Sequence, residues 1–367
     1  MIVYKYIARE IFWPVLVAFF FLNLLFLVVQ ILKIATLAVG VGLGLPDMLH
    51  IVLYSLPSFA VFTIPIAVLT GVLLGLGRMT ADGELVALAG AGVSNLGLSA
   101  VPAVIGVAAS LMAFCFASWV APAANMALRR TFVDLSKRHI AASLDPGRFF
   151  DDIPGVVLFP RRTAGAPGEF DGLMMFDRRP GRARHLLFAA RAKVKPGRTG
   201  NFLDLNLAGG EVHALDRRRR LYSLAMFEKA SVAIDIDRLV DERTRFISPT
   251  DSLDLSELAA AAGERSRSPR EQAVYSAAWQ RRFAFPAAAF FFSLLACALG
   301  AMGKLRGRRH TLLYSAGLVA AYYLLSRAGD AVAGKAWFHP ALVAWLPDII
   351  IFGLACWLLV LRGRRAG

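Results

Sequence analysis

The chain of 367 residues has little charge and few cysteines. Asp, Glu, Lys and Arg make up 18% of it and hydrophobic residues 57%, against about 25% and 45–50% in soluble globular proteins. A mean hydropathy of +0.56 excludes an ordinary cytosolic enzyme and a disordered tail. Cys115, Cys297 and Cys356 all lie in apolar runs and are too few for a disulfide framework. These deficits predict an integral membrane protein.

Motifs of catalysis and nucleotide binding are also missing. The sequence contains no GxxxxGK followed by Ser or Thr, no HExxH, no CxxC and no GxSxG, and its six histidines are scattered. The segment that ends at Gly303 and Lys304 matches only part of a Walker A motif and follows an apolar run instead of a strand. We therefore predict no enzyme activity, no cofactor and no metal site, so the energy for any transport has to come from a partner chain.

Uncharged runs define the membrane spans, since about 20 apolar helical residues cross a bilayer. The first run is too long for the core of a signal peptide, and no A-x-A-like site follows it, so we expect it to remain as an anchor. Six spans in a 3+3 arrangement are predicted. They lie within residues 11–32 and 48–77, at about 96–120, at 283–303, and at about 311–333 and 341–361.

The predicted domains follow from these runs. Residues 1–121 hold the first three spans, 122–282 an inserted domain with its linkers, and 283–367 the last three spans with a basic tail. With the N-terminus inside, ten basic residues flank the cytoplasmic ends, against Lys33 and Lys335 at the outer ends. The positive-inside rule therefore places both termini in the cytoplasm and the inserted domain outside. The net charge of +15 points to anionic lipid or another polyanion as a neighbour.

The inserted domain has the pattern of an antiparallel β-structure. Short apolar runs are bounded by Pro, Gly, Asp and Arg, and residues 202–207 alternate with period two. Gly209 and Gly210 then predict a tight turn into a strand at 211–215, because glycine supplies the positive φ of such turns. Strand spacings near ten residues favour a sandwich or a jelly roll. The inner face would carry Leu205 and Leu207.

The connection between the second and third spans is the most informative segment. Thr80 or Asp82 is suited to cap a short helix at about 80–90, and Leu85 and Leu88 fall on one face of it. The glycines at 90 and 92 would end the helix. In an ABC exporter such a cytoplasmic helix docks into the ATPase. The alternative is an ordinary connector with one capped helical turn, which composition alone favours by about two to one.

Several segments form an ordered set along the chain. They are residues 6–10, 71–78 and 83–94, the strand and turn that carry Leu205, Leu207, Gly209 and Gly210, and residues 279–283 and 303–309. This set resembles the LptF/LptG permease family, the paired membrane subunits of the lipopolysaccharide exporter, and the resemblance extends over essentially the whole chain. The N-terminal spans resemble LptF and the C-terminal end resembles LptG, and the balance leans slightly to LptF.

This resemblance implies a machine in the inner membrane of a Gram-negative-type cell. Two permeases of the family, placed on an LptB-like cytoplasmic ATPase dimer, extract lipopolysaccharide and pass it along periplasmic jelly rolls to LptC/LptA-like proteins. No nucleic acid is implied. The resemblance also implies an ATPase-coupling segment that contains Arg78, Asp82, Glu84, Leu85 and Leu88.

It further implies that Lys33, at the outer end of span one, contacts the glycolipid, whereas a snorkelling anchor is the alternative. Arg327 and Asp330 would lie near the lateral gate. Their spacing of three residues equally fits a pair that neutralises itself.

Two other classes of function stay open. An ion-coupled secondary transporter is disfavoured, because it would place ionisable residues near the midplane and show paired repeats. A membrane-anchored scaffold that displays a β-domain would not need six spans.

Overall fold

The structure is a computed structural model, described here for most of the chain. The described residues are 2–41, 44–93, 95–166, 168–179, 184–197, 202–216, 221–235, 248–264, 266–300, 308–333 and 339–366.

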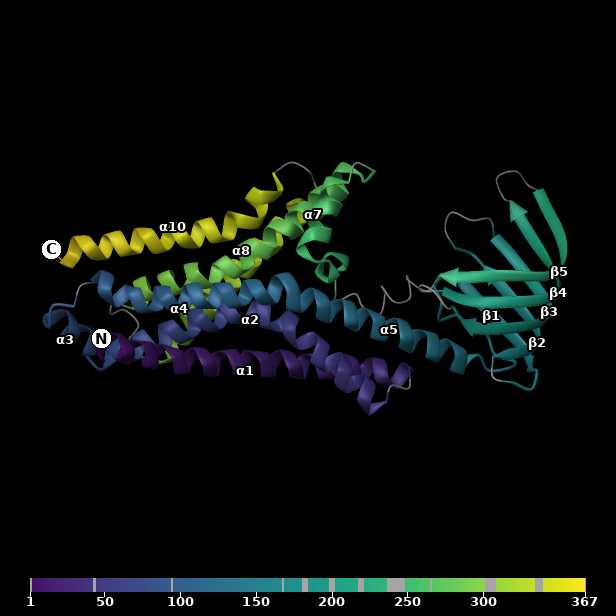
Figure 1. Ribbon diagram of the computed structural model, residues 1–367, viewed down its shortest axis with the longest axis horizontal. Helices are drawn as coiled ribbons and strands as arrows, with labels where there is room; N and C mark the ends of the chain where they lie inside the picture. The colour runs from purple at the N-terminus through teal and green to yellow at the C-terminus, as the bar shows by residue number, and fades with distance from the viewer. Residues whose placement is uncertain are drawn as a thin grey trace. The chain divides into compact units, whose positions relative to one another are not determined.

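Along the chain, helices precede and follow a five-stranded sheet (Figure 1). Before the sheet come α1 (Ile2–Val41), α2 (Leu45–Ala81), α3 (Glu84–Gly90), α4 (Asn95–Cys115), a π-helix (Phe116–Val120) and α5 (Ala121–Ser143). After it come a 3-10 helix (Pro249–Ser252), α7 (Leu255–Gly263), α8 (Pro269–Gly300), α9 (Arg308–Ala333) and α10 (Pro340–Ala366).

The chain divides into two compact units. The helical unit comprises Met1–Lys33, Val52–Met126 and Ser248–Gly367. The sheet unit comprises Ile34–Ile51 and Ala127–Ile247. The helix of the third span continues through the π-helix into α5 and ends at Ser143. The inserted domain, predicted to begin at residue 122, therefore begins with a helix and not with a strand.

Five helical segments of the described chain are long and apolar enough to cross a membrane. They include α1, α2, α8 and α10, and the fifth runs from α4 into α5. The remaining predicted span, α9, forms a helix of 26 residues, about 39 Å long at 1.5 Å per residue. Its composition is less apolar than that of the other five, and Arg327 and Asp330 lie in its last two turns. The prediction of an α-helical membrane protein with several spans is confirmed.

The helical unit packs around α2 and α8. In the most apolar window of α2, 72% of the residues are buried, against 6% in that of α1. Gly71 and Gly75 let α1 approach closely, since a Cβ atom at Gly71 would lie 2.4 Å from the backbone nitrogen of Val15. These small residues of the second span therefore form a helix contact.

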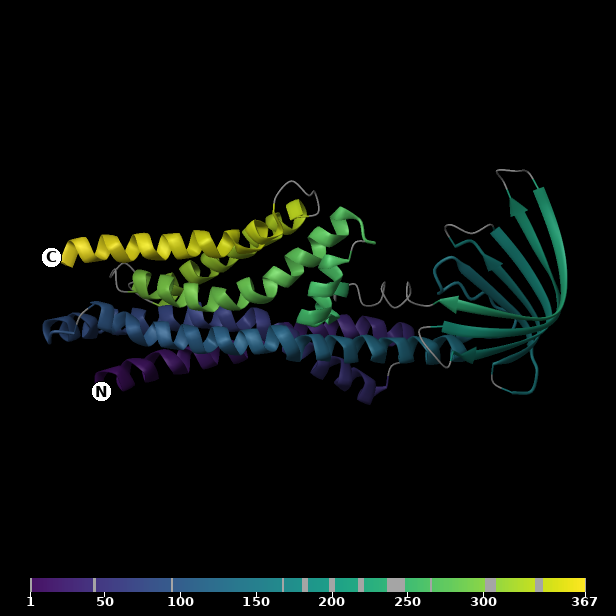
Figure 2. The ribbon, with the colours of Figure 1, turned by 45° about the horizontal axis from the view of Figure 1, so that its top comes forward.

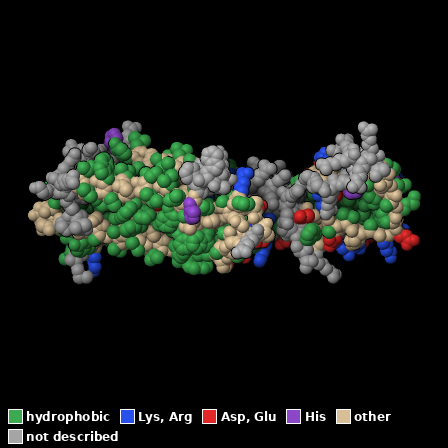
Figure 3. Space-filling model, turned by 90° about the horizontal axis from the view of Figure 1, so that it is seen from above, with side chains coloured by type: hydrophobic (Ala, Val, Ile, Leu, Met, Phe, Trp, Pro, Cys, Tyr) green, Lys and Arg blue, Asp and Glu red, His purple; other side chains and the backbone are tan. Residues whose placement is uncertain are grey.

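The face of the helical unit that is visible in Figure 3 is largely apolar. Phe20, Phe21, Leu24 and Leu32 on α1 are each more than half exposed. Hydrophobic side chains cover most of this unit in Figure 3, whereas charged ones gather on the sheet unit. Such a surface suits lipid or a second membrane protein, not water.

The inserted domain contains one antiparallel sheet with the strand order β1-β2-β3-β4-β5. The strands are β1 (Val156–Thr163), β2 (Glu169–Asp177), β3 (Arg184–Pro196), β4 (Phe202–Asp216) and β5 (Leu221–Asp235). They bend strongly along their length in Figure 2. The all-β insert is confirmed. Its described strands follow one another as a meander, whereas the strands of a complete jelly roll are joined by Greek keys.

The predicted turn at Gly209 and Gly210 is wrong. Strand β4 runs through both residues, with Ala189 opposite Gly210 and Arg191 opposite Ala208. Gly209, with a φ of 60°, stands opposite Ala190, and the register of β4 is the same on both sides of it. A Cβ atom at Gly210 would lie 2.1 Å from the carbonyl oxygen of Phe188. The glycines therefore serve a positive φ and a close strand contact inside β4, not a reversal of the chain.

Candidate functional site

The segment between α2 and α4 forms the predicted short helix, but it begins later than predicted. Thr80 and Ala81 still belong to α2, and α3 begins at Glu84. The N-cap position is Gly83, with a φ of 75° and no side-chain cap, so capping by Thr80 or Asp82 is wrong. The hydroxyl of Thr80 donates instead toward the carbonyl oxygens of Leu76, at 2.8 Å, and Gly300, at 2.9 Å. The end of α8 therefore lies beside the end of α2.

The end of α3 follows the predicted chemistry. The Val93 N–H donates to the Leu88 carbonyl at 3.1 Å and the Gly92 N–H to Ala89 at 3.0 Å, with Gly92 in the left-handed region. This pair of bonds is a Schellman motif. Leu85 is buried and Leu88 packs against the same core, which confirms the apolar face. Val86 points away from the core and is 76% exposed.

Side chains of α1 hold this connection in place. Arg78 Nη1 lies 3.1 Å from Glu10 Oε2, and Arg78 Nε lies 3.6 Å from Asp82 Oδ2. The hydroxyl of Tyr6 lies 2.9 Å from each carboxylate oxygen of Glu84 and donates to them. Exposed ion pairs contribute only about 0–1 kcal/mol each. Their effect here is to fix the orientation of α3 relative to the start of α1.

Lys33, the next predicted residue, lies toward the C-terminal end of α1, close to the point where Gln30 of α1 meets Ser55 of α2. Gln30 is buried and donates from Nε2 to Ser55 Oγ of α2 at 3.2 Å. Lys33, three residues later, lies on the exposed side of α1. The hydrophobic stretch that precedes it is exposed at Leu24 and Leu32. A single ammonium thus follows an apolar helix surface, as the sequence predicts.

Helix α9 carries the other predicted outer residues. Arg327 is exposed, and its guanidinium carbon lies 5.8 Å from the ring centre of Tyr323. The side chain of Asp330 lies outside the described residues, so a pair between Arg327 and Asp330 stays a prediction. The neighbouring Tyr322 donates to Asp348 Oδ1 of α10 at 3.3 Å, and Asp348 is only 1% exposed. This bond fastens α9 to α10.

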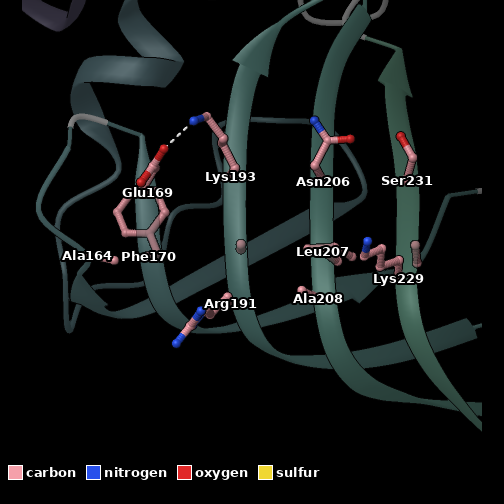
Figure 4. A pocket seen from close by; sticks show the side chains of 12 residues that line it. Ala164, Glu169, Phe170, Arg191, Lys193, Asn206, Leu207, Ala208, Lys229 and Ser231 are labelled. Carbon is pink, nitrogen blue, oxygen red and sulfur yellow. Dashed lines mark hydrogen bonds and ion pairs between the residues drawn. The ribbon is translucent and has the colours of Figure 1, made fainter.

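A pocket of about 530 Å³ crosses the sheet (Figure 4). Phe170, Ala192, Leu207 and Ala230 stand opposite one another on four adjacent strands and give it an apolar row. Leu205 and Leu207 are both buried, as the alternation of β4 predicts.

Charged residues alternate with this apolar row along the strands, so their side chains point to the exposed face of the sheet. On that face Lys193 forms an ion pair with Glu169 of the neighbouring strand, and Arg191 and Lys229 also line the pocket. The ammonium of Lys193 holds the pKa of the Glu169 carboxyl below its ordinary value, through their hydrogen bond and charge. The lining thus combines an apolar row on the buried face with mostly cationic side chains on the exposed face.

Within the described ranges, no three His, Cys, Asp or Glu side chains are placed to hold a metal ion together.

Comparison with known proteins decides the family. The family model described as "Lipopolysaccharide export system permease LptF/LptG" matches residues 5–361, nearly the whole chain. The chain belongs to the LptF/LptG family. The lipopolysaccharide export system permease protein LptF of Escherichia coli (strain K12) is 22% identical over 360 residues, which are 97% of this chain and 93% of that protein. The proteins of the same name from Escherichia coli O157:H7 and Shigella flexneri match equally well.

These relatives agree with the slight preference for LptF over LptG that the N-terminal spans of this LptF/LptG chain indicated. The family match also accounts for both halves of the molecule, since it includes the helices before and after the sheet.

Two residues of this LptF/LptG protein were not predicted as part of the coupling site. Tyr6 and Glu10 lie 78 and 68 positions before their partners Glu84 and Arg78. Both belong to residues 6–10, a segment that carries the family resemblance. The resemblance indicated that this segment is important, but it did not indicate which residues Tyr6 and Glu10 contact. A spacing of four residues places them on one face of α1.

Proposed function

We propose that this LptF/LptG protein is a permease subunit of an ABC transporter that extracts lipopolysaccharide from the inner membrane and passes it to a periplasmic bridge. The observation that carries the proposal is the family match over residues 5–361. A membrane protein of several spans with an inserted β-sheet suits that role, because a glycolipid needs a hydrophobic path from the bilayer into water.

The driving force would come from a separate cytoplasmic ATPase dimer. Helix α3 is suited to dock into it, since Leu85 and Leu88 anchor the helix to the permease while Val86 faces outward. Arg78, Asp82 and Glu84 would form its charged flank. Tyr6, Thr80 and the end of α8 lie at this same end of the helical unit. That arrangement supports a cytoplasmic N-terminus and a cytoplasmic end of α8, on the side where α3 would meet the ATPase.

Purification in mild detergent tests this proposal. The wild-type chain is expected to bring a separate ATP-binding chain and a second permease of the family, with ATP hydrolysis in the complex. An anchored scaffold would bring no ATPase. A secondary transporter would move its substrate in vesicles on an ion gradient without ATP. Recovery of the chain without any ATPase, from membranes that still export the glycolipid, would contradict the proposal.

A second permease is the expected neighbour of α1. The apolar side chains of this helix are exposed over most of its length, although a membrane protein buries such surfaces against lipid or another helix. In a paired exporter the gap between α1 of one permease and α9 of the other would admit cargo. Lys33, Arg327 and Asp330 would then stand near the outer mouth of that gate.

Replacement of Lys33 is expected to impair export in proportion to the change of charge. Lipid A is a polyanion, so an ammonium at headgroup level attracts its phosphates. Lys33→Glu should therefore reduce export several-fold and more than Lys33→Ala, measured as surface lipopolysaccharide at equal protein level. Lys335, which lies outside the described residues, is the control and should tolerate both changes. Normal export with Lys33→Glu would leave Lys33 as a snorkelling anchor.

The apolar inner face of the sheet unit is expected to hold acyl chains. Photo-crosslinking residues at Ala192 and Leu207, on its apolar row, should capture glycolipid during ATP-driven transport. Lys195 and Asp204 are the matched control, because they stand opposite each other on the same two strands but do not line the pocket. They lie an odd number of residues from Ala192 and Leu207, so their side chains point to the other face of the sheet and should capture far less. Equal labelling at both pairs would contradict this assignment.

A further inference from the structure

The helix that continues the third span contains a π-turn directly before a proline. In an α-helix the carbonyl of residue i accepts from the N–H of residue i+4, and in a π-helix from residue i+5. The N–H of Ala121 donates to the carbonyl of Phe116, five residues earlier. In the same pattern the carbonyl of Ala117 would need the N–H of residue 122. That residue is Pro122, which has no N–H.

Arg282 of α8 supplies the missing donor. Its Nη1 donates to the carbonyl oxygen of Ala117. Ala117 is buried, so water does not substitute easily, and a buried carbonyl without a donor is destabilising. The sequence of the helix therefore leaves the Ala117 carbonyl without a backbone donor, and Arg282, 165 positions away, donates to it.

The other arm of the guanidinium binds the segment that follows the sheet in the chain. Nη2 of Arg282 lies 3.1 Å from the carbonyl oxygen of Thr250, 3.4 Å from that of Asp251 and 3.0 Å from that of Leu253. These residues form the 3-10 helix and its C-cap, the first described residues after β5. One planar group with five donors thus joins two segments that a single ammonium would not span.

Asn125 makes a parallel connection one turn beyond the π-helix. Its Nδ2 donates to the Asp251 carbonyl at 3.1 Å, and its Oδ1 accepts from the Ser58 hydroxyl of α2 at 2.8 Å. Helices α2, α5 and α8 and the 3-10 helix therefore meet in one hydrogen-bonded cluster, all of it within the helical unit.

We propose that Arg282 is a positioning residue that locks the π-turn, replacing the backbone hydrogen bond that Pro122 removes and tying the start of α5 to the segment by which the chain returns from the sheet. The hydrogen bonding of the turn between α4 and α5 is then completed by α8. Opening of that turn requires Arg282 to release Ala117. The proposal does not depend on the identity of the cargo.

Hydrogen exchange of the full-length chain, purified in detergent, tests the lock with a double-variant design. Arg282→Met keeps the length of the side chain but removes all donors, so amides at 116–126 and at 249–254 should exchange about tenfold faster. Pro122→Ala restores an N–H to the helix. In the double variant it should return the protection of 116–126 to within about twofold of wild type, while 249–254 stays fast. Arg282→Lys should protect only one of the two segments.

Three outcomes would overturn the proposal. The first is a double variant in which Pro122→Ala restores nothing at 116–126. The second is that Arg282→Met accelerates hydrogen exchange in α9 and α10 as strongly as in the two named segments, since this would indicate general destabilisation. If Arg282→Met does not yield folded protein, the double variant is expected to recover it, and failure of that recovery also contradicts the lock.

Discussion

Gly71→Val is expected to abolish the recovery of folded protein. At this position α1 and α2 touch through their backbones, and an added Cβ atom would lie 2.4 Å from the Val15 nitrogen and 2.5 Å from its Cα atom. Neither atom belongs to a flexible side chain, so the two helices have to separate. Overpacking of this kind typically costs about 1–3 kcal/mol, and more where backbone has to shift. The yield of monodisperse protein and its Tm in detergent measure the effect.

Gly353→Val is the matched control for this substitution. Gly353 also lies inside a membrane helix, α10, but a Cβ atom added there would meet no heavy atom of another part of the described chain within 4 Å. The same change of residue type should therefore shift the Tm by only a few degrees at most. An equal loss of protein for both variants would show that valine is not tolerated for reasons other than the contact between α1 and α2.

Glu84→Ala is expected to uncouple ATP hydrolysis from transport. On the proposed function, the Glu84 carboxylate at the start of α3 forms a charge-assisted hydrogen bond or ion pair with the ATPase. Its loss should lower export at least about tenfold, which corresponds to about 1.4 kcal/mol of lost interaction. The measurements are recovery of the ATPase with the permease and the amount of lipopolysaccharide released per ATP hydrolysed.

Tyr6→Phe separates this role from an internal one. Tyr6 donates its hydroxyl hydrogen to Glu84, so the phenylalanine variant frees α3 from α1 but leaves the carboxylate in place. Export in Tyr6→Phe should fall much less than in Glu84→Ala. If the two variants lose export equally and both retain the ATPase, Glu84 serves only to hold α3 against α1.

The sequence was sufficient for five of the six predicted spans in the described chain, because membrane crossing is a local property. A helix satisfies its own backbone within a segment of about 20 residues, so an uncharged run of that length defines a span without knowledge of its neighbours. The same applies to the end of α3, where Gly92 adopts the positive φ of a Schellman motif. Turn chemistry was less reliable. The pair Gly209 and Gly210 has the composition of a hairpin turn, yet the positive φ of Gly209 occurs inside the continuous strand β4.

The start of α3 shows the same limit. Thr80 is chemically suited to be an N-cap, but its hydroxyl donates to the carbonyls of Leu76 and Gly300, and the second of these is 220 residues away. Capping depends on which acceptors and donors lie nearby in space. The local sequence shows the groups of the same segment, but not those that distant segments bring to it.

The sequence by itself therefore determined the membrane class, the inserted β-domain, the apolar face of α3 and the family resemblance, because each depends on periodicity, composition or ordered short segments. The tertiary structure alone decided which distant groups complete one another. It brought Tyr6 and Glu10 to the connection between α2 and α4, buried Asp348 against Tyr322, and placed Arg282 at the carbonyl that Pro122 leaves without a donor. Hydrogen bonds act over about 3 Å in space regardless of separation along the chain, so only the folded arrangement reveals such pairs.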